Sequence, residues 1–192
     1  AAMSLRRLLA QLNCGDDELA EAAARVLPDF GERALAALSE MCASENVESR
    51  WWATRALGEL PGSAATELLV KRLKDEDAEV RVVAILALGQ RADLAAVQPL
   101  TEMLHECGGY LARHAAEALS RLGDGAAPAL VDALGGGDTG VRANAARALA
   151  RLSDSEAVPA LVQALDDESA VVSHWAEIAL ERRGVGMLFF QP

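Results

Sequence analysis

Residues 76–106 read EDAEVRVVAILALGQRADLAAVQPLTEMLHE, and this pattern returns along the chain. A leucine that follows a small residue recurs every 30 or 31 residues. The pairs are Val26-Leu27, Ala56-Leu57, Ala87-Leu88, Ala118-Leu119, Ala148-Leu149 and Ala179-Leu180. Self-similarity at this period is typical of a solenoid, whose repeats contact mainly their neighbours and whose long surfaces suit partner binding.

A second recurring position predicts a second helix in each repeat. It holds Leu12, Cys42, Leu73, Leu104, Leu134 and Leu165, with the same spacings. In the first helix of the quoted repeat, Val80, Ala84 and Leu88 fall on one face at 100° per residue. We name this helix A and the following one helix B. Pro99 is compatible with the first turn of helix B, because the amide hydrogen that proline lacks would have no intrahelical partner there.

Short polar residues precede helix A, where their side chains can cap the first free amides. They are Asn46, Asp77, Asp138 and Ser169. Arg81 and Arg142 follow two of these caps by one turn, and each arginine is expected to pair either with its own cap or with the next repeat. Ala112 and Ser173 replace the arginine in repeats four and six, so a ladder of such pairs should be broken there.

The repeats resemble the short HEAT-like, armadillo-like repeat first described in phycobilisome lyases. The resemblance rests on Asp77, Val80-Arg81, Ala84 and Ala87-Leu88-Gly89 followed by Pro99-Leu100, and on Asp138, Val141-Arg142, Ala145 and Ala148-Leu149. It covers nearly the whole chain. It implies an all-α fold, a right-handed α-solenoid of about six HEAT-like helical hairpins of 30–31 residues that begins with a half repeat.

We expect a single HEAT-like repeat domain over residues 1–192. Residues 1–2 are interpreted as a cloning remnant and residues 3–14 as an N-terminal half repeat. Repeats are predicted at 16–43, 45–75, 76–106, 108–136, 138–167 and 169–183. Residues 184–192 break the pattern and are predicted to fold back as a C-terminal cap. The alternatives are an exposed docking motif or the point where a longer protein was cut.

Composition restricts the partners. The net charge of −11 argues against nucleic acid, because phosphate binding needs a basic surface. No apolar run approaches the ~20 residues of a membrane-spanning helix, and no signal peptide is seen at the start. We therefore predict a cytoplasmic protein that binds neither nucleic acid nor membrane. Cys14, Cys42 and Cys107 agree with a reducing compartment, and Cys42 should be a buried small hydrophobe.

Catalytic and metal-binding patterns are not found. His105, His114 and His174 lie in different repeats. In deoxyhypusine hydroxylase, a HEAT-like metal enzyme that the repeats also resemble, His-Glu pairs in several repeats hold iron. Here Arg113-His114-Ala115 lacks the acid and His105-Glu106 stands alone. We predict no catalytic residue, no metal site and no cofactor, and hence no enzyme.

One side of helix B is the first candidate surface for a partner. In repeats one to five, the outward position two residues before the second recurring position holds Glu40, Lys71, Glu102, Asp132 and Gln163, and His105 lies beside this row. The family resemblance implies that helix B lines the concave side. Because the row leans acidic, we expect a basic peptide or an arginine-bearing face of a folded protein. The alternative is an ordinary solvated face, since isolated exposed charges contribute little.

An outward apolar patch on helix A is the second candidate. Trp51, Val82 and Leu86 occupy positions that should point away from the core and lie near one another. The alternative is that Trp51 lies flat on its neighbour and hides the other two. Trp52 and Trp175 share a position beside the core stripe and are interpreted as packing residues.

Two function classes follow. The first is a non-enzymatic protein–protein interaction scaffold or adaptor, with self-association through the Trp51 patch or the C-terminal tail as one use. The second, implied by the resemblance, is a bilin lyase subunit or lyase-associated chaperone that handles a tetrapyrrole and a biliprotein. A bilin site needs cationic groups for propionates, and the helix B row offers only Lys71.

Overall fold

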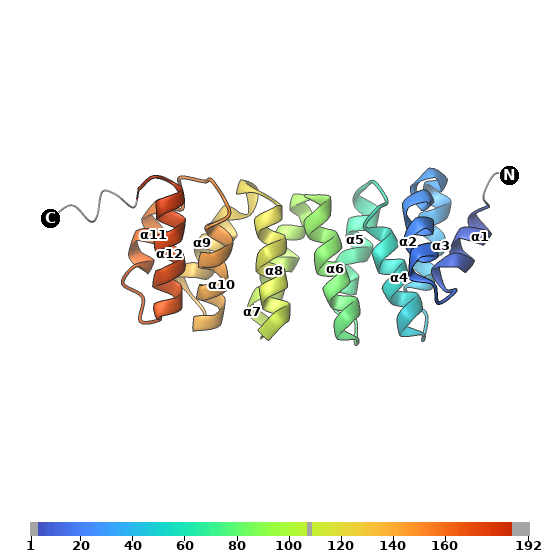
Figure 1. Ribbon diagram of the computed structural model, residues 1–192, viewed down its shortest axis with the longest axis horizontal. Helices are drawn as coiled ribbons and strands as arrows, with labels where there is room; N and C mark the ends of the chain where they lie inside the picture. The colour runs from blue at the N-terminus through green and yellow to red at the C-terminus, as the bar shows by residue number, and fades with distance from the viewer. Residues whose placement is uncertain (1–3, 107–108, 186–192) are drawn as a thin grey trace. The chain divides into compact units, whose positions relative to one another are not determined.

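The computed structural model describes residues 4–106 and 109–185, and every regular element in these ranges is helical (Figure 1). Residues 1–2, Cys107 and all but the first two residues of the predicted cap lie outside these ranges. The helix A elements are α2 (Asp17–Val26), α4 (Val47–Leu57), α6 (Ala78–Arg91), α8 (Gly109–Arg121), α10 (Thr139–Leu149) and α12 (Ala170–Arg182). The helix B elements are α1 (Leu5–Leu12), α3 (Glu32–Met41), α5 (Ser63–Arg72), α7 (Val97–Glu106), α9 (Ala127–Gly135) and α11 (Val158–Ala164). Short 3-10 turns are η1 (Leu27–Phe30), η2 (Leu94–Ala96) and η3 (Asp124–Ala126).

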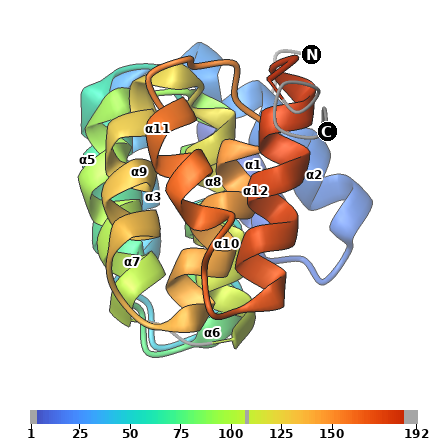
Figure 2. The same cartoon turned by 90° about the vertical axis from the view of Figure 1, so that its left-hand side faces the viewer.

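The chain divides into two compact units, residues 1–91 (unit 1) and residues 92–192 (unit 2). In unit 1, α2, α4 and α6 contact one another in order, and each packs on the helix B element that precedes it. Unit 2 repeats this arrangement with α8, α10 and α12 against α7, α9 and α11. Figure 2 shows α7, α9 and α11 on one side of unit 2, with α10 and α12 on the other. The expected all-α HEAT-like hairpins are confirmed, whereas the single domain over residues 1–192 stays a prediction.

Leucine and alanine form the core of both units. The helix A leucines are at most 2% exposed, which confirms that register. The helix B residues of the second register are at most 4% exposed, with one exception. Leu165 is half-buried because α11 has no further helix B beyond it among the described residues. In repeats two to six, the alanine four residues before the helix A leucine has no exposed surface; these residues are Ala53, Ala84, Ala115, Ala145 and Ala176. Trp52 and Cys42 are buried as predicted, and Trp175 is half-buried.

Three of the four predicted helix caps form. Asn46 Oδ1 accepts from the Ser49 amide at 3.0 Å, and Asp138 Oδ1 accepts from the Val141 amide at 2.9 Å. Asp77 Oδ1 accepts from two amides of α6. The prediction for Ser169 is wrong, because its side chain makes no capping bond and its own amide donates instead to the Asp167 carboxylate.

Arginines of helix A join successive repeats. Arg50 pairs with Asp75 at 3.0 Å and Arg142 pairs with Asp167 at 2.8 Å, in each case with a carboxylate just before the next helix A. Arg142 therefore pairs with the next repeat and not with its own cap. Arg81 instead donates to the backbone carbonyls of Asp75 and Glu76.

The sequence analysis did not predict a second set of arginine contacts, in which the side chains donate to backbone carbonyls of the preceding repeat. Arg91 donates to the carbonyls of Leu57, Leu60 and Gly62 in the preceding repeat. Arg183 stands at the equivalent position and donates to the Leu149 carbonyl at 2.9 Å. Each arginine reaches the last carbonyl of the previous helix A, that of Leu57 or Leu149, which has no partner within that helix.

Candidate functional site

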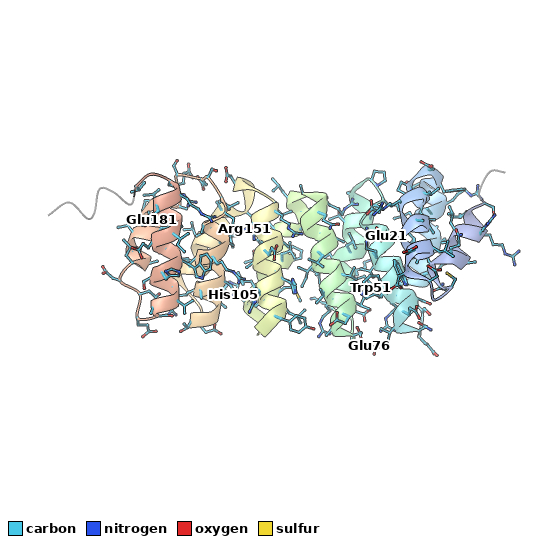
Figure 3. All side chains as sticks on the ribbon, in the orientation of Figure 1. Glu21, Trp51, Glu76, His105, Arg151 and Glu181 are labelled. Atoms are coloured by element: carbon cyan, nitrogen blue, oxygen red, sulfur yellow. The ribbon has the colours of Figure 1, made fainter. Side chains whose placement is uncertain are left out.

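A groove of unit 1 lies between α2 and α4. Its volume is about 700 Å³, and its lining consists of Asp17, Glu21, Val47, Glu48, Trp51 and Trp52. Figure 3 labels Glu21 and Trp51 on these two neighbouring helices. The groove forms because equivalent turns of successive A helices face each other, so that residues 30 positions apart in the sequence become neighbours.

Aromatic and aliphatic groups form the apolar part of this groove. Trp51 is half-buried and meets Trp52 edge to face, with ring centroids 4.8 Å apart and planes at 79°. Both rings line the groove, but Trp52 is only 7% exposed and belongs mainly to the core. Val47 is 42% exposed at the same surface. An aliphatic chain can therefore lie against Trp51 and Val47.

The carboxylates of the groove differ in how they are compensated. Glu21 accepts from Arg55 at 2.6 Å and from Arg25 at 3.2 Å, so its charge is already paired. Asp17 and Glu48 make no ion pair or side-chain hydrogen bond with any described residue. Both lie in the first turn of a helix, where the helix dipole favours a negative charge. Uncompensated negative charge thus lies beside an aromatic ring.

Val82 and Leu86 do not belong to this groove. Both are half-buried on α6, whereas the groove lining comes from α2 and α4. Of the three residues predicted to form the apolar patch, only Trp51 lines this groove. Participation of any of the three in partner binding stays a prediction.

The predicted helix B residues are all exposed. Glu40 and Lys71 lie in unit 1, and the others lie in unit 2: Glu102, His105, Asp132 and Gln163. The amide of Gln98 donates to Glu102 at 3.2 Å, one turn away on α7. Each residue is therefore accessible within its own unit, but no contact distinguishes it as a binding residue.

A groove of about 300 Å³ follows helix B in unit 1, between α3 and α5. It is lined by Glu32, Leu35, Ala36, Ser39, Ala64, Glu67, Leu68 and Lys71. Lys71 was predicted, but Glu32 and Glu67 were missed. Glu67 precedes Lys71 by one turn, and Glu32 precedes Glu40 by about two, so extending the outward row along each helix would have found them.

The histidines and cysteines are dispersed. In the part of the chain that the structure describes, no three His, Cys, Asp or Glu side chains could together hold a metal ion. His174 lines a groove of about 370 Å³ in unit 2 with Leu165, Ala170, Ser173 and Glu177. Burial raises the pKa of the Cys42 thiol, and the nearby Arg72 opposes this only in part. Such a thiol is a poor nucleophile, since the thiolate is the reactive form.

No helix within residues 4–106 and 109–185 is long and apolar enough to cross a membrane.

Comparisons with known proteins bear on the fold. The family model for HEAT repeats matches residues 5–81, 44–120 and 107–181. The structure of YibA from Escherichia coli is similar over 95% of this chain and 72% of that chain, at 23% identity and a TM-score of 0.62. No curated protein matches the chain.

Two further solved structures that are similar to this chain are complexes. The complex of CpcE and CpcF of phycocyanin lyase from Nostoc sp. PCC7120 is 24% identical, with a TM-score of 0.54, over 97% of this chain and 78% of that chain. A designed armadillo repeat protein in complex with the peptide (KR)4 is 20% identical, with a TM-score of 0.51, over 94% of this chain and all of that chain. At these identities both show likeness of fold.

Proposed function

This chain belongs to the HEAT-repeat family, and on that premise we propose that it is a non-enzymatic protein-interaction module whose partner contributes a basic segment. One observation carries the proposal. In the α2/α4 groove, Trp51 lies beside two carboxylates, Asp17 and Glu48, that no described residue neutralises. Such a surface is chemically matched to a lysine or arginine side chain.

The fit follows from the two parts of a basic side chain. Its aliphatic stem can pack on Trp51 and Val47 while its charged head approaches Asp17 or Glu48. A cation over an exposed indole ring contributes about 0.5–1 kcal/mol. The net charge of −11 would also raise the rate at which a basic segment arrives.

Helix B provides a second surface for the same kind of partner. In unit 1, Glu32 and Glu67 line the α3/α5 groove, with the half-buried Leu35 and Leu68 between them. The designed armadillo neighbour is described in complex with (KR)4, which makes a basic peptide a reasonable probe for this chain. We include the exposed helix B residues of unit 2 in this proposal as a separate surface.

Titration of the whole chain against fluorescein-labelled (KR)4, followed by anisotropy, tests the proposal. Asp17→Asn combined with Glu48→Gln should weaken binding about fivefold or more, because charged contacts to a peptide are lost. The matched control is Glu18→Gln with Glu79→Gln, which removes the same charge from first-turn residues of α2 and α6 outside the groove. Equal loss in both variants would show only general attraction to an acidic protein.

Two further variants assign the surface. Trp51→Ala should weaken (KR)4 binding while circular dichroism shows unchanged helicity, and unchanged affinity would remove the groove from the proposal. Glu40→Lys with Glu102→Lys examines helix B in the same assay. A loss of affinity in that variant supports helix B, whereas a gain would show that the expected charge of the partner is wrong.

The likeness to the CpcE–CpcF complex supports a second candidate, a bilin lyase subunit or lyase-associated chaperone. We place it second because propionates need cations. The lining of the α2/α4 groove contains none, and that of the α3/α5 groove contains one, Lys71. Addition of a bilin followed by visible spectroscopy separates the candidates, because a bound tetrapyrrole changes its absorption and an unchanged spectrum contradicts the second.

A further inference from the structure

Four arginines of unit 2 lie in two successive repeats, and only two of them pair with a carboxylate among the described residues. Arg113 and Arg121 lie on α8, Arg147 lies on α10, and Arg151 lies in the turn that follows α10. Glu117 pairs with Arg121 at 3.0 Å and with Arg151 at 3.7 Å. We call these four arginines the arginine face. Positive charge is concentrated there although the protein has a net charge of −11.

Two members of the arginine face form no ion pair with a described residue. Arg147 donates to the neutral Asn144 Oδ1 at 3.1 Å, and Arg113 makes no ion pair or side-chain hydrogen bond there. Partial burial lowers the pKa of Arg147, and the charges of Arg113 and Arg151 lower it further, with Glu117 opposing them. Like charges are therefore held together with too little compensation from the fold.

The geometry points to a ligand, and we propose that the arginine face binds an acidic segment of a partner protein. Guanidinium groups bind carboxylates through two parallel hydrogen bonds, which suits them to this role. This site differs in charge and location from the grooves of unit 1, so the proposal does not depend on the basic partner proposed above.

The spacing of the arginines favours a peptide over a small anion. Arg113 and Arg121 are eight residues apart on one helix, which places their backbones about 12 Å apart. A single phosphate is short compared with such a row and would compensate only part of its charge. Alternate residues of an extended peptide are about 6.6 Å apart, so two or three glutamates can meet successive arginines.

The charge of the rest of the protein disfavours a long polyanion. Nucleic acid would extend beyond the arginine face and meet a chain with 29 acidic and 18 basic residues. A short acidic segment neutralises the arginines without this repulsion, because screening confines each interaction to about 8 Å at physiological salt. The site thus selects a ligand by its length as well as by its charge.

The experiment is a titration of the whole chain against fluorescein-labelled hexaglutamate, read by anisotropy. Arg113→Glu with Arg151→Glu should weaken binding about tenfold or more, since both attraction and sign are changed. The matched control is Arg6→Glu with Arg33→Glu, two exposed arginines of unit 1 with no side-chain contact in the described residues. Its affinity should stay within about twofold of the wild type, because Arg6 and Arg33 do not belong to the arginine face and isolated exposed charges contribute little. Circular dichroism confirms that both variants fold.

Four results would overturn the proposal. They are no binding by the wild-type chain at millimolar peptide, equal loss in the control variant, full displacement of the peptide by inorganic phosphate, and tighter binding of a short oligo(dT) through the same arginines. The third result would assign a simple anion site and the fourth a nucleic-acid site. Arg147→Gln provides an independent check, because it removes the central cation without reversing any charge and should weaken the peptide to a smaller extent.

Discussion

Replacement of Asp75 by alanine should be among the most damaging single changes in unit 1. The side chains of Arg50 and Asp75 are 6% and 3% exposed, and their closest charged atoms are 3.0 Å apart. Asp75 also accepts from Arg72 at 3.3 Å and from the Asp77 amide at 3.0 Å. Its removal leaves a buried guanidinium without its main counter-charge, which costs about 3–5 kcal/mol in the free energy of unfolding.

Glu76 offers a control on the same guanidinium. It contacts Arg50 Nη2 at 3.0 Å, the same distance as Asp75, but its side chain is 83% exposed. Glu76→Ala should therefore cost less than about 1 kcal/mol, because water screens the pair. The double change Arg50→Met with Asp75→Leu should cost less than Asp75→Ala alone, since it leaves no uncompensated buried charge.

Urea denaturation measures these free energies. Trp51 and Trp52 report on unit 1 if Trp175 of unit 2 is first replaced by phenylalanine, and circular dichroism follows both units. The midpoint should fall strongly for Asp75→Ala and little for Glu76→Ala, with similar slopes. An Asp75→Ala cost no greater than that of Glu76→Ala would refute the reasoning that burial makes this pair important.

Two other predictions concern acid sensitivity and the core. The pKa of Asp167 is lowered, chiefly by the hydrogen bond from Arg142, so the stability it contributes is present above the unfolded carboxyl pKa of about 3.9 and is lost as the pH falls below that value. Asp167→Asn should therefore flatten the acid side of a plot of melting temperature against pH, and an unchanged slope would contradict this. Leu88→Ala should lower the free energy of unfolding by about 2–5 kcal/mol, because Leu88 is fully buried. Leu86→Ala on the same helix should lower it less in the same urea assay, because Leu86 is half-buried.

The two candidate surfaces were predictable to different degrees. The exposure of the helix B row follows from the helical period alone, and Glu67 lay one turn from a residue already chosen. The sequence analysis predicted that Trp51 points outward and that its neighbours are Val82 and Leu86 of α6. In the structure Trp51 lines a groove formed by α2 and α4. The helical period predicts the direction in which a side chain points from its own helix. It does not predict which neighbouring helix that side chain contacts.

Local information in the chain was enough for the helices, their two leucine registers and three of four caps. These features depend on residues within one or two turns of each other, and repetition along the chain reinforces them. Contacts between repeats needed the folded chain. Arg50 meets an aspartate 25 residues away, Arg183 reaches a carbonyl 34 residues away, and Arg113 lies near Arg147 only after α8 and α10 have packed. Such contacts depend on the angle and offset at which successive hairpins stack, and these are set by side-chain packing across the whole unit.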